Sequence, residues 1–263
     1  MNPSALHATA LSFRHPGAEK DLLHAIQLEV PRGSLTLLLG PNGAGKSTLI
    51  KLLCGLLEPT AGKVALEGTP LHALSGMERG KRIALVPQQA PAGTGFTVRE
   101  MIAMARAPHL GILPFESGED RRIVDTVLES FGLEPLRERD FDSCSGGERE
   151  RVMLARAVAL QPDYLLLDEP TSSQDPRQQG AVLKHLSREA ASGRGVLMVT
   201  HDWNLAAAVS SPLYLLLGGH LYRGTLEALL AIPAVQDFVG DEMSITRTVE
   251  GRWAVLPKPL TSP

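Results

Sequence analysis

The sequence predicts an α/β fold with a mainly parallel sheet, an antiparallel edge and an inserted helical part. Short apolar runs alternate with helical patterns, which is typical of a parallel sheet covered by helices. The strand signal then disappears between residues 97 and 160. With 263 residues, 43% hydrophobic and 21% charged, the chain is expected to form one domain over 1–263, with a helical subdomain at about 92–160.

The expected strands follow one another along the chain. Around Leu11 to Phe13 and Ile26 to Val30, apolar and polar residues alternate, which is typical of a half-buried antiparallel edge. Four other runs are nearly continuous in apolar residues, as expected of strands buried on both faces. They are Ser34 to Leu39, Arg82 to Val86, Tyr164 to Leu167 and Val196 to Val199.

Two helices are expected in the inserted part. Thr97 and Glu100 form a capping box that predicts a helix over residues 98–106. A second helix has its apolar residues on one face and ends at Gly132. Those apolar residues are Ile123, Val124, Val127, Leu128 and Phe131.

Composition and charge exclude several classes of protein. The net charge is -3 and the basic residues are scattered, so no nucleic-acid partner is expected. Cys54 and Cys144 have neither a disulfide framework nor metal-ligand spacing, which favours a reducing cytosol. No apolar run approaches the roughly 20 residues that cross a bilayer, and the N-terminus lacks the pattern of a secretion signal. A membrane role would therefore require a partner.

Residues 40–47 match the full phosphate-binding loop, or P-loop, pattern and follow a predicted buried strand. Glycines allow backbone N–H groups to turn towards an anion, and the helix that starts near Lys46 directs its positive dipole end at the phosphates. Lys46 is expected to reach the β- and γ-phosphates of ATP and Ser47 to ligate Mg²⁺. The expected nucleotide contacts are Gly40, Pro41, Asn42, Gly43, Ala44, Gly45, Lys46, Ser47 and Thr48.

Two carboxylates follow another apolar strand. Asp168 is expected to hold Mg²⁺ through water, and Glu169 to orient or deprotonate the attacking water. The alternative is that two acids after a strand only mark where the chain meets solvent. The upstream P-loop favours the catalytic interpretation and a P-loop NTPase core.

Further motifs decide which P-loop class the chain resembles. The sequence resembles ABC ATPases along nearly its whole length, with the motifs in the family's order. They are Gln88 of the Q-loop, Ser145-Gly146-Gly147-Glu148 of the signature, Ser172 to Asp175 of the D-loop, and His201 as the switch histidine.

The resemblance implies functional roles for these positions. It implies a head-to-tail homodimer in which the signature of one copy faces the P-loop of the other, with two ATP molecules between them. The implied catalytic residues are Lys46, Gln88, Glu169 and His201, and the implied Mg²⁺ residues are Ser47, Gln88 and Asp168. The further nucleotide contacts are Ser145, Gly146, Gly147 and Asp175, with His15 in the place of the aromatic residue that stacks on adenine.

The signature also has a reading that needs no family. Ser145 and Glu148 form a capping box, and Gly146 and Gly147 leave the N–H groups of that helix start bare, which makes a second anion site. The alternative is simply a well-capped helix. Cys144, Glu148 and Gln174 stand where the family commonly has leucine, glutamine and leucine.

Within the family, residues 97–100 and 106–109 are similar to importer ATPases for metal chelates, namely iron-siderophore, haem and cobalamin systems, and so is the tail at 238–240 and 256–257. This likeness implies membrane-spanning permease subunits, a substrate-binding protein reached through the permease, and a peripheral place on the cytoplasmic face of the inner (plasma) membrane. Phe96, Met101 and Ile102 are expected to help dock the permease. An exporter ATPase, a non-transport ATPase and a P-loop kinase remain as alternatives, although the chain lacks the coiled coil or second ATPase domain of the non-transport types.

Overall fold

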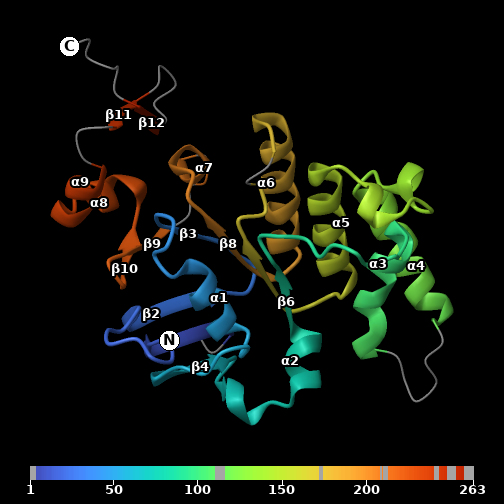
Figure 1. The fold of residues 1–263 in the computed structure, drawn as a ribbon, viewed down its shortest axis with the longest axis horizontal. Coiled ribbons are helices and arrows are strands. Elements are labelled where there is room, and N and C mark those ends of the chain that lie inside the picture. The colour runs from blue at the N-terminus through green and yellow to red at the C-terminus, as the bar shows by residue number, and fades with distance from the viewer. Residues whose placement is uncertain are drawn as a thin grey trace.

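A computed structural model describes residues 4–109, 116–171, 174–207, 209, 213–239, 243–247 and 253–257. Figure 1 shows a central sheet with an antiparallel sheet on one side and a group of helices on the other. The pattern of buried strands in the sequence predicts the central sheet of this arrangement.

The central sheet has six strands in the order β10-β9-β3-β8-β7-β6. Strands β6, β7, β8, β3 and β9 are parallel, and β10 pairs antiparallel with β9. All residues of β3, β7 and β8 are buried, which confirms the two-sided burial expected of their apolar runs. The strands are β3 (Leu35–Leu39), β6 (Ile83–Val86), β7 (Tyr164–Asp168), β8 (Gly195–Thr200), β9 (Leu213–Leu217) and β10 (His220–Gly224).

The antiparallel edge predicted at the N-terminus is a separate sheet of four strands in the order β2-β1-β4-β5. In β2, buried positions alternate with more exposed ones over much of the strand, in keeping with the sequence pattern. The four strands are β1 (Ala5–Phe13), β2 (Leu23–Pro31), β4 (Ala61–Leu66) and β5 (Thr69–Pro70).

Helices cover the central sheet and connect its strands. Helix α1 (Lys46–Leu53) follows β3, and α6 (Pro176–Ala191) lies between β7 and β8. The other elements outside the helical part are η1 (Leu71–Ala73), α2 (Gly76–Arg82), α7 (Trp203–Ala207), α8 (Leu226–Leu230), α9 (Pro233–Val239), β11 (Met243–Arg247) and β12 (Trp253–Pro257).

Between β6 and β7, the described residues form helices and one isolated bridge, Thr97↔Asp140. The capping box at Thr97 and Glu100 is present. The expected helix over 98–106 is wrong at its end, because the α-helix stops at Ala103 and continues as a 3-10 helix that contains Pro108. Proline disfavours the α conformation in the residue before it and lacks the N–H that an α-helix uses.

The helical part comprises α3 (Val98–Ala103), η2 (Met104–His109), α4 (Gly118–Ser130), η3 (Glu134–Leu136), η4 (Phe141–Ser143) and α5 (Gly146–Ala159). Met101 and Ile102 are 2% and 0% exposed and belong to the hydrophobic core that α3, α4 and α5 share. They are therefore not available to a docked partner, and the expectation for these two residues is wrong. Phe96 is 41% exposed.

Candidate nucleotide site

The P-loop joins β3 to α1 and turns tightly at two glycines. Gly43 and Gly45 have φ values of 80° and 99°, which side-chain-bearing residues rarely adopt. Gly40 is needed for a different reason, since a Cβ at this position would lie 2.6 Å from the carbonyl oxygen of Leu216. The loop therefore brings backbone N–H groups and the positive end of α1 to one place, where an anion can bind.

Lys46 is buried in this loop, at 5% exposed. Its Nζ donates hydrogen bonds to the carbonyl oxygens of Gly40 and Pro41, each at 2.9 Å. It also lies 3.4 Å from the carboxylate of Glu169. The ammonium group is thus held next to the loop that would surround the phosphates.

Glu169 is the point where three predicted site residues meet. Gln88 Nε2 donates to its carboxylate at 3.1 Å, and His201 Nδ1 lies 3.0 Å from the same oxygen. Gln88, Glu169 and His201 follow β6, β7 and β8, three neighbouring strands that run parallel and end at one edge of the sheet. The topology therefore brings together residues up to 113 positions apart in the printed sequence.

The backbone of Glu169 is strained. Its φ is 51°, which is uncommon for any residue other than glycine, and its N–H donates to the carbonyl of Val199 at 3.1 Å. Such conformations cluster at functional sites, where the surrounding structure holds them. The residue is 7% exposed and lines the cavity over the P-loop.

Asp168 and Ser47 fit a magnesium ion. Burial raises the pKa of Asp168, and the hydrogen bond with the Ser47 side chain opposes that shift. Asp168 Oδ1 is buried and has no hydrogen-bond partner, as expected of an oxygen whose ligand is a cation or its bound water. Gln88 bonds Glu169 through its amide nitrogen, and its amide oxygen is the atom suited to a cation.

A cavity of about 430 Å³ lies over the P-loop. Its lining comprises His15, Leu22, Asn42, Gly43, Gly45, Lys46, Ser47, Thr48, Gln88 and Glu169. The exposed His15 ring stands edge-on to Phe13, with ring centroids 4.9 Å apart. Leu22 was not identified from the sequence, where an isolated leucine outside any motif gives no signal.

The other expected nucleotide contacts lie apart from this cavity. Ser145 caps α5 in a capping box with Glu148, which places Gly146 and Gly147 in the first turn of the helix. Asp175 caps α6, accepting bonds from the N–H groups of Arg177 and Gln178 at 2.9 and 3.0 Å. None of Ser145, Gly146, Gly147 and Asp175 lines the P-loop cavity.

The signature and the D-loop are instead neighbours of each other. Gly147, Gln174 and Gln178 line a second cavity, of about 280 Å³, between α5 and α6. Ser172 and Ser173 of the D-loop lie outside the described residues. The P-loop and the signature glycines therefore lie at different places in the described part of the chain.

A P-loop after β3, with a carboxylate pair at the end of β7 in the same parallel sheet, defines a nucleotide-binding protein of the P-loop class. Residues 23–172, more than half of the chain, match the sequence model of the ABC transporter family, and the chain belongs to that family. It is an ATP-binding protein of the kind that couples ATP hydrolysis to transport.

Relatives and solved structures agree with this assignment. The hemin import ATP-binding protein HmuV of Pseudomonas putida is 40% identical over 233 residues, covering 86% of this chain and 89% of that protein. The iron(3+)-hydroxamate import ATP-binding protein FhuC of Bacillus subtilis is 38% identical, covering 73% of this chain and 72% of that protein. A solved ABC transporter assigned to the metal-chelate type, in an inward-facing conformation, superposes with a TM-score of 0.81 at 27% identity, covering 98% of this chain and 99% of that chain.

No helix in the described part of the chain has the length and apolar character that crossing a membrane requires.

Proposed function

We propose that this chain hydrolyses ATP to drive uptake of a metal chelate through a membrane-spanning permease. The observation that carries the proposal is the convergence of Lys46, Gln88 and His201 on Glu169 beside the P-loop. A P-loop kinase has no need of this histidine or of a second anion site.

In the proposed reaction, Lys46 exchanges the carbonyls of Gly40 and Pro41 for the β- and γ-phosphates. Glu169 orients or deprotonates the attacking water, and His201 holds the Glu169 carboxylate and the transferred phosphoryl group in place. Ser47, Asp168 and Gln88 would hold Mg²⁺, which would supply positive charge that stabilises the phosphates. The loop N–H groups and the α1 dipole bind the remaining phosphate oxygens.

The two separated half-sites support a head-to-tail homodimer. In this arrangement, Ser145, Gly146 and Gly147 of one copy contact the nucleotide on the P-loop of the other, and Asp175 lies near the same interface. His15 stacks on the adenine. We further propose that residues 1–263 form one ABC ATPase domain with a helical subdomain at about 92–160.

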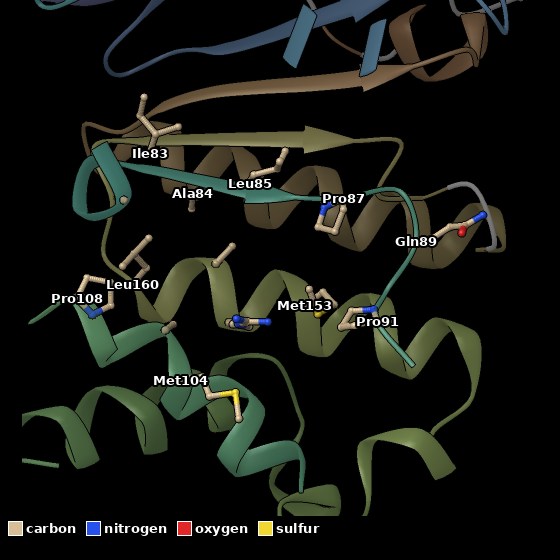
Figure 2. A pocket seen from close by; sticks show the side chains of 14 residues that line it. Ile83, Ala84, Leu85, Pro87, Gln89, Pro91, Met104, Pro108, Met153 and Leu160 are labelled. Atoms are coloured by element: carbon tan, nitrogen blue, oxygen red, sulfur yellow. The ribbon is translucent and has the colours of Figure 1, made fainter. Parts of the chain in front are cut away.

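A groove between the central sheet and the helical part is the proposed docking site for the permease. It has a volume of about 530 Å³, and its walls come from β6 and the loop after it, from η2 and from α5, as Figure 2 shows. The exposed mouth is mainly apolar, with Leu85, Pro87, Met104 and Met153 among the lining side chains. A short permease helix with an apolar face suits this groove.

Permease docking implies the rest of the assembly. The chain would lie as a peripheral subunit on the cytoplasmic face of the inner (plasma) membrane, and a substrate-binding protein would act on it only through the permease. The names of HmuV and FhuC favour hemin or a ferric chelate as cargo. Import is favoured over export because these relatives are import proteins.

The test is reconstitution of the chain in lipid vesicles with its native permease partner. A cognate substrate-binding protein loaded with hemin or ferric hydroxamate should raise the ATPase rate severalfold and move the chelate in the direction of import. Export of the chelate, or stimulation by a substrate-binding protein of another chemical class only, would refute the metal-chelate importer.

A further inference from the structure

One short segment connects the catalytic carboxylate to the groove. Gln88 contacts Glu169, and Pro87, Gln89 and Pro91 line the groove on either side of it. Residues 88–96 therefore start at the ATP site, pass the proposed docking site and then reach the helical part. The residues that contact the far end of this segment would move with it if the segment were displaced.

The far end binds a single carboxylate, that of Asp142. The backbone N–H groups of Gly93, Thr94 and Gly95 donate to it at 3.0, 2.7 and 3.2 Å, and the Thr94 hydroxyl donates at 3.2 Å. Gly93 and Gly95 have φ values of 68° and 66°, which allows three successive N–H groups to converge on one anion. These hydrogen bonds, above all the one from Gly95, favour the ionised carboxylate and lower the pKa of Asp142.

Backbone hydrogen bonds continue this contact beyond the carboxylate. Phe141 N–H donates to the carbonyl of Phe96 at 2.9 Å, and Val98 N–H to the carbonyl of Arg139 at 2.9 Å. Arg99 N–H donates to the carbonyl of Arg137 at 3.0 Å. Residues 93–99 and 137–142 thus lie side by side and are joined along their whole length.

The Asp142 end of this contact is tied directly to the signature. Asp142 precedes Ser145, the N-cap of α5, by three residues. Arg149, in the second turn of α5, donates to the carbonyl of Asp142 and, at 3.1 Å, to that of Cys144. Because the Arg149 guanidinium binds the carbonyls at both ends of residues 142–144, this loop and the start of α5 form one unit.

We propose that Asp142 is a positioning residue that links the groove segment to the signature, so that the place of residues 93–95 determines the place of Ser145 and Gly146. This inference rests on the proposed function, in which those two residues contact the nucleotide of a second copy. The link acts on the half-site that completes catalysis and leaves nucleotide binding at the chain's own P-loop unaffected.

The first test separates binding from turnover. In Asp142→Ala, the affinity for a fluorescent ATP analogue should stay within about twofold of the wild-type value, and kcat should fall about tenfold or more. Asp142→Asn has the same shape and retains one acceptor oxygen, so its kcat should lie between that of the wild type and that of Asp142→Ala. An equal loss of nucleotide affinity, or an unchanged kcat in Asp142→Ala, would overturn the proposal.

Two control variants distinguish the link from the local fold. Thr94→Val removes only the hydroxyl and keeps the three N–H donors, so kcat should remain within about twofold of wild type. Asp140 caps the same 3-10 turn by accepting from the Asp142 N–H at 2.8 Å, but its side chain has no hydrogen bond to residues 93–95. Asp140→Ala should lower thermal stability and keep most of kcat, whereas a kcat loss equal to that of Asp142→Ala would assign the effect to the turn.

Hydrogen exchange tests the transmission without measuring activity. In a Glu169→Gln background, ATP should slow amide exchange in both residues 93–95 and 142–148, and adding Asp142→Ala should reduce the slowing in both segments. An ATP response at 93–95 that is independent of Asp142, or absent in its presence, would refute the link. Gly146→Asp distinguishes a failure of the link from a failure of the shared ATP site. If Gly146→Asp and Asp142→Ala both retain full turnover, the shared ATP site has failed. If Gly146→Asp is inactive while Asp142→Ala is active, only the link has failed.

Discussion

At the scale of single residues, Glu169 is the catalytic base that we propose, and its surroundings support this role. It is buried, its backbone has positive φ, and its carboxylate contacts Lys46, Gln88 and His201. Motif chemistry predicted Lys46 and Glu169, and the family resemblance predicted Gln88 and His201. The structure brings Gln88, Glu169 and His201 together because their three strands end at one edge of a parallel sheet. The sequence could not predict the additional contact of Lys46 with the Gly40 and Pro41 carbonyls, which depends on side-chain packing.

Glu169→Gln tests the role of the base. The substitution preserves shape and removes the proton acceptor, so turnover should fall about 100-fold or more while ATP is still bound and the dimer accumulates. Single-turnover hydrolysis and size-exclusion chromatography with ATP measure the two effects. Glu138→Gln is the control, since Glu138 is a surface residue with a side chain 76% exposed. Wild-type turnover in Glu169→Gln would contradict the assignment.

His15 is tested by changing its ring. If it stacks on adenine, His15→Ala should weaken ATP binding and His15→Tyr should retain or improve it, because a base–aromatic stack is worth about 1–3 kcal/mol. The readout is the Kd for ATP compared with that for a triphosphate lacking a base. Should His15→Ala weaken both ligands equally, His15 would not contact the adenine.

The reactivity expected of the Cys144 thiol depends on how deeply its side chain is buried. Its place beside the signature suggests an interface thiol, but the side chain is 5% exposed and lies 3.6 Å from the carbonyl of Asp140. Burial raises the pKa of its thiol, and it raises that of Cys54 to about 12. Because the thiolate is the reactive form, maleimide at pH 7 should label neither cysteine of the folded protein quickly, with or without ATP. Rapid labelling of Cys144 in a Cys54→Ser variant would contradict this.

At the scale of elements, local sequence signals predicted several helices and strands, whereas contacts between distant residues could not be predicted. Capping boxes and two-sided apolar strands are encoded within a few residues, so α3, α5, β3, β7 and β8 were found. Pro108 changed the end of the first inserted helix to 3-10 geometry, and a buried ion pair holds that segment in place. The sequence offered no sign that Arg106 would meet Asp120, since the pairing depends on how η2 packs against α4 and α5.

The Arg106–Asp120 pair should govern the stability of the helical part. Both side chains are 8% exposed and 2.8 Å apart, and Arg106 also donates to the carbonyls of Ala159 and Leu160 at the end of α5. Arg106→Met leaves a buried carboxylate without its partner, which should cost about 3–5 kcal/mol in urea unfolding. Adding Asp120→Asn should recover part of that loss, whereas strictly additive losses would mean that the two groups do not interact.

The pH dependence of the same pair has a defined sign. Hydrogen bonds from Ser117 and then Arg106 lower the pKa of Asp120 in the folded chain. A carboxylate with a lowered folded pKa stabilises the fold above its unfolded pKa, near 4, and this contribution is lost as the pH falls through the folded pKa. Asp120→Asn should therefore reduce the dependence of unfolding free energy on pH in the acidic range. An acid slope identical to that of the wild type would contradict the shift.

At the scale of the whole molecule, the P-loop cavity is separate from the signature, and we therefore propose that neither half-site is complete alone. The sequence predicted both half-sites and their order but not their distance from each other, because distance depends on how the helical part packs beside the sheet. Lys46 and Gly146 represent the two halves. Lys46→Ala should disable the nucleotide side, and Gly146→Asp should place a negative charge where the partner's phosphate binds.

Mixing these two variants tests the shared site. Each mutant homodimer should be inactive, because both of its composite sites carry a defect. A mixed dimer collects both lesions in one site and leaves the other with an intact P-loop from one copy and an intact signature from its partner. Mixing should therefore restore part of the hydrolysis if one intact site can turn over. Wild-type activity should also rise more steeply than linearly with protein concentration while the dimer is partly formed. Full ATPase activity from a strictly monomeric protein, unaffected by Gly146→Asp, would return the chain to the class of self-sufficient P-loop enzymes.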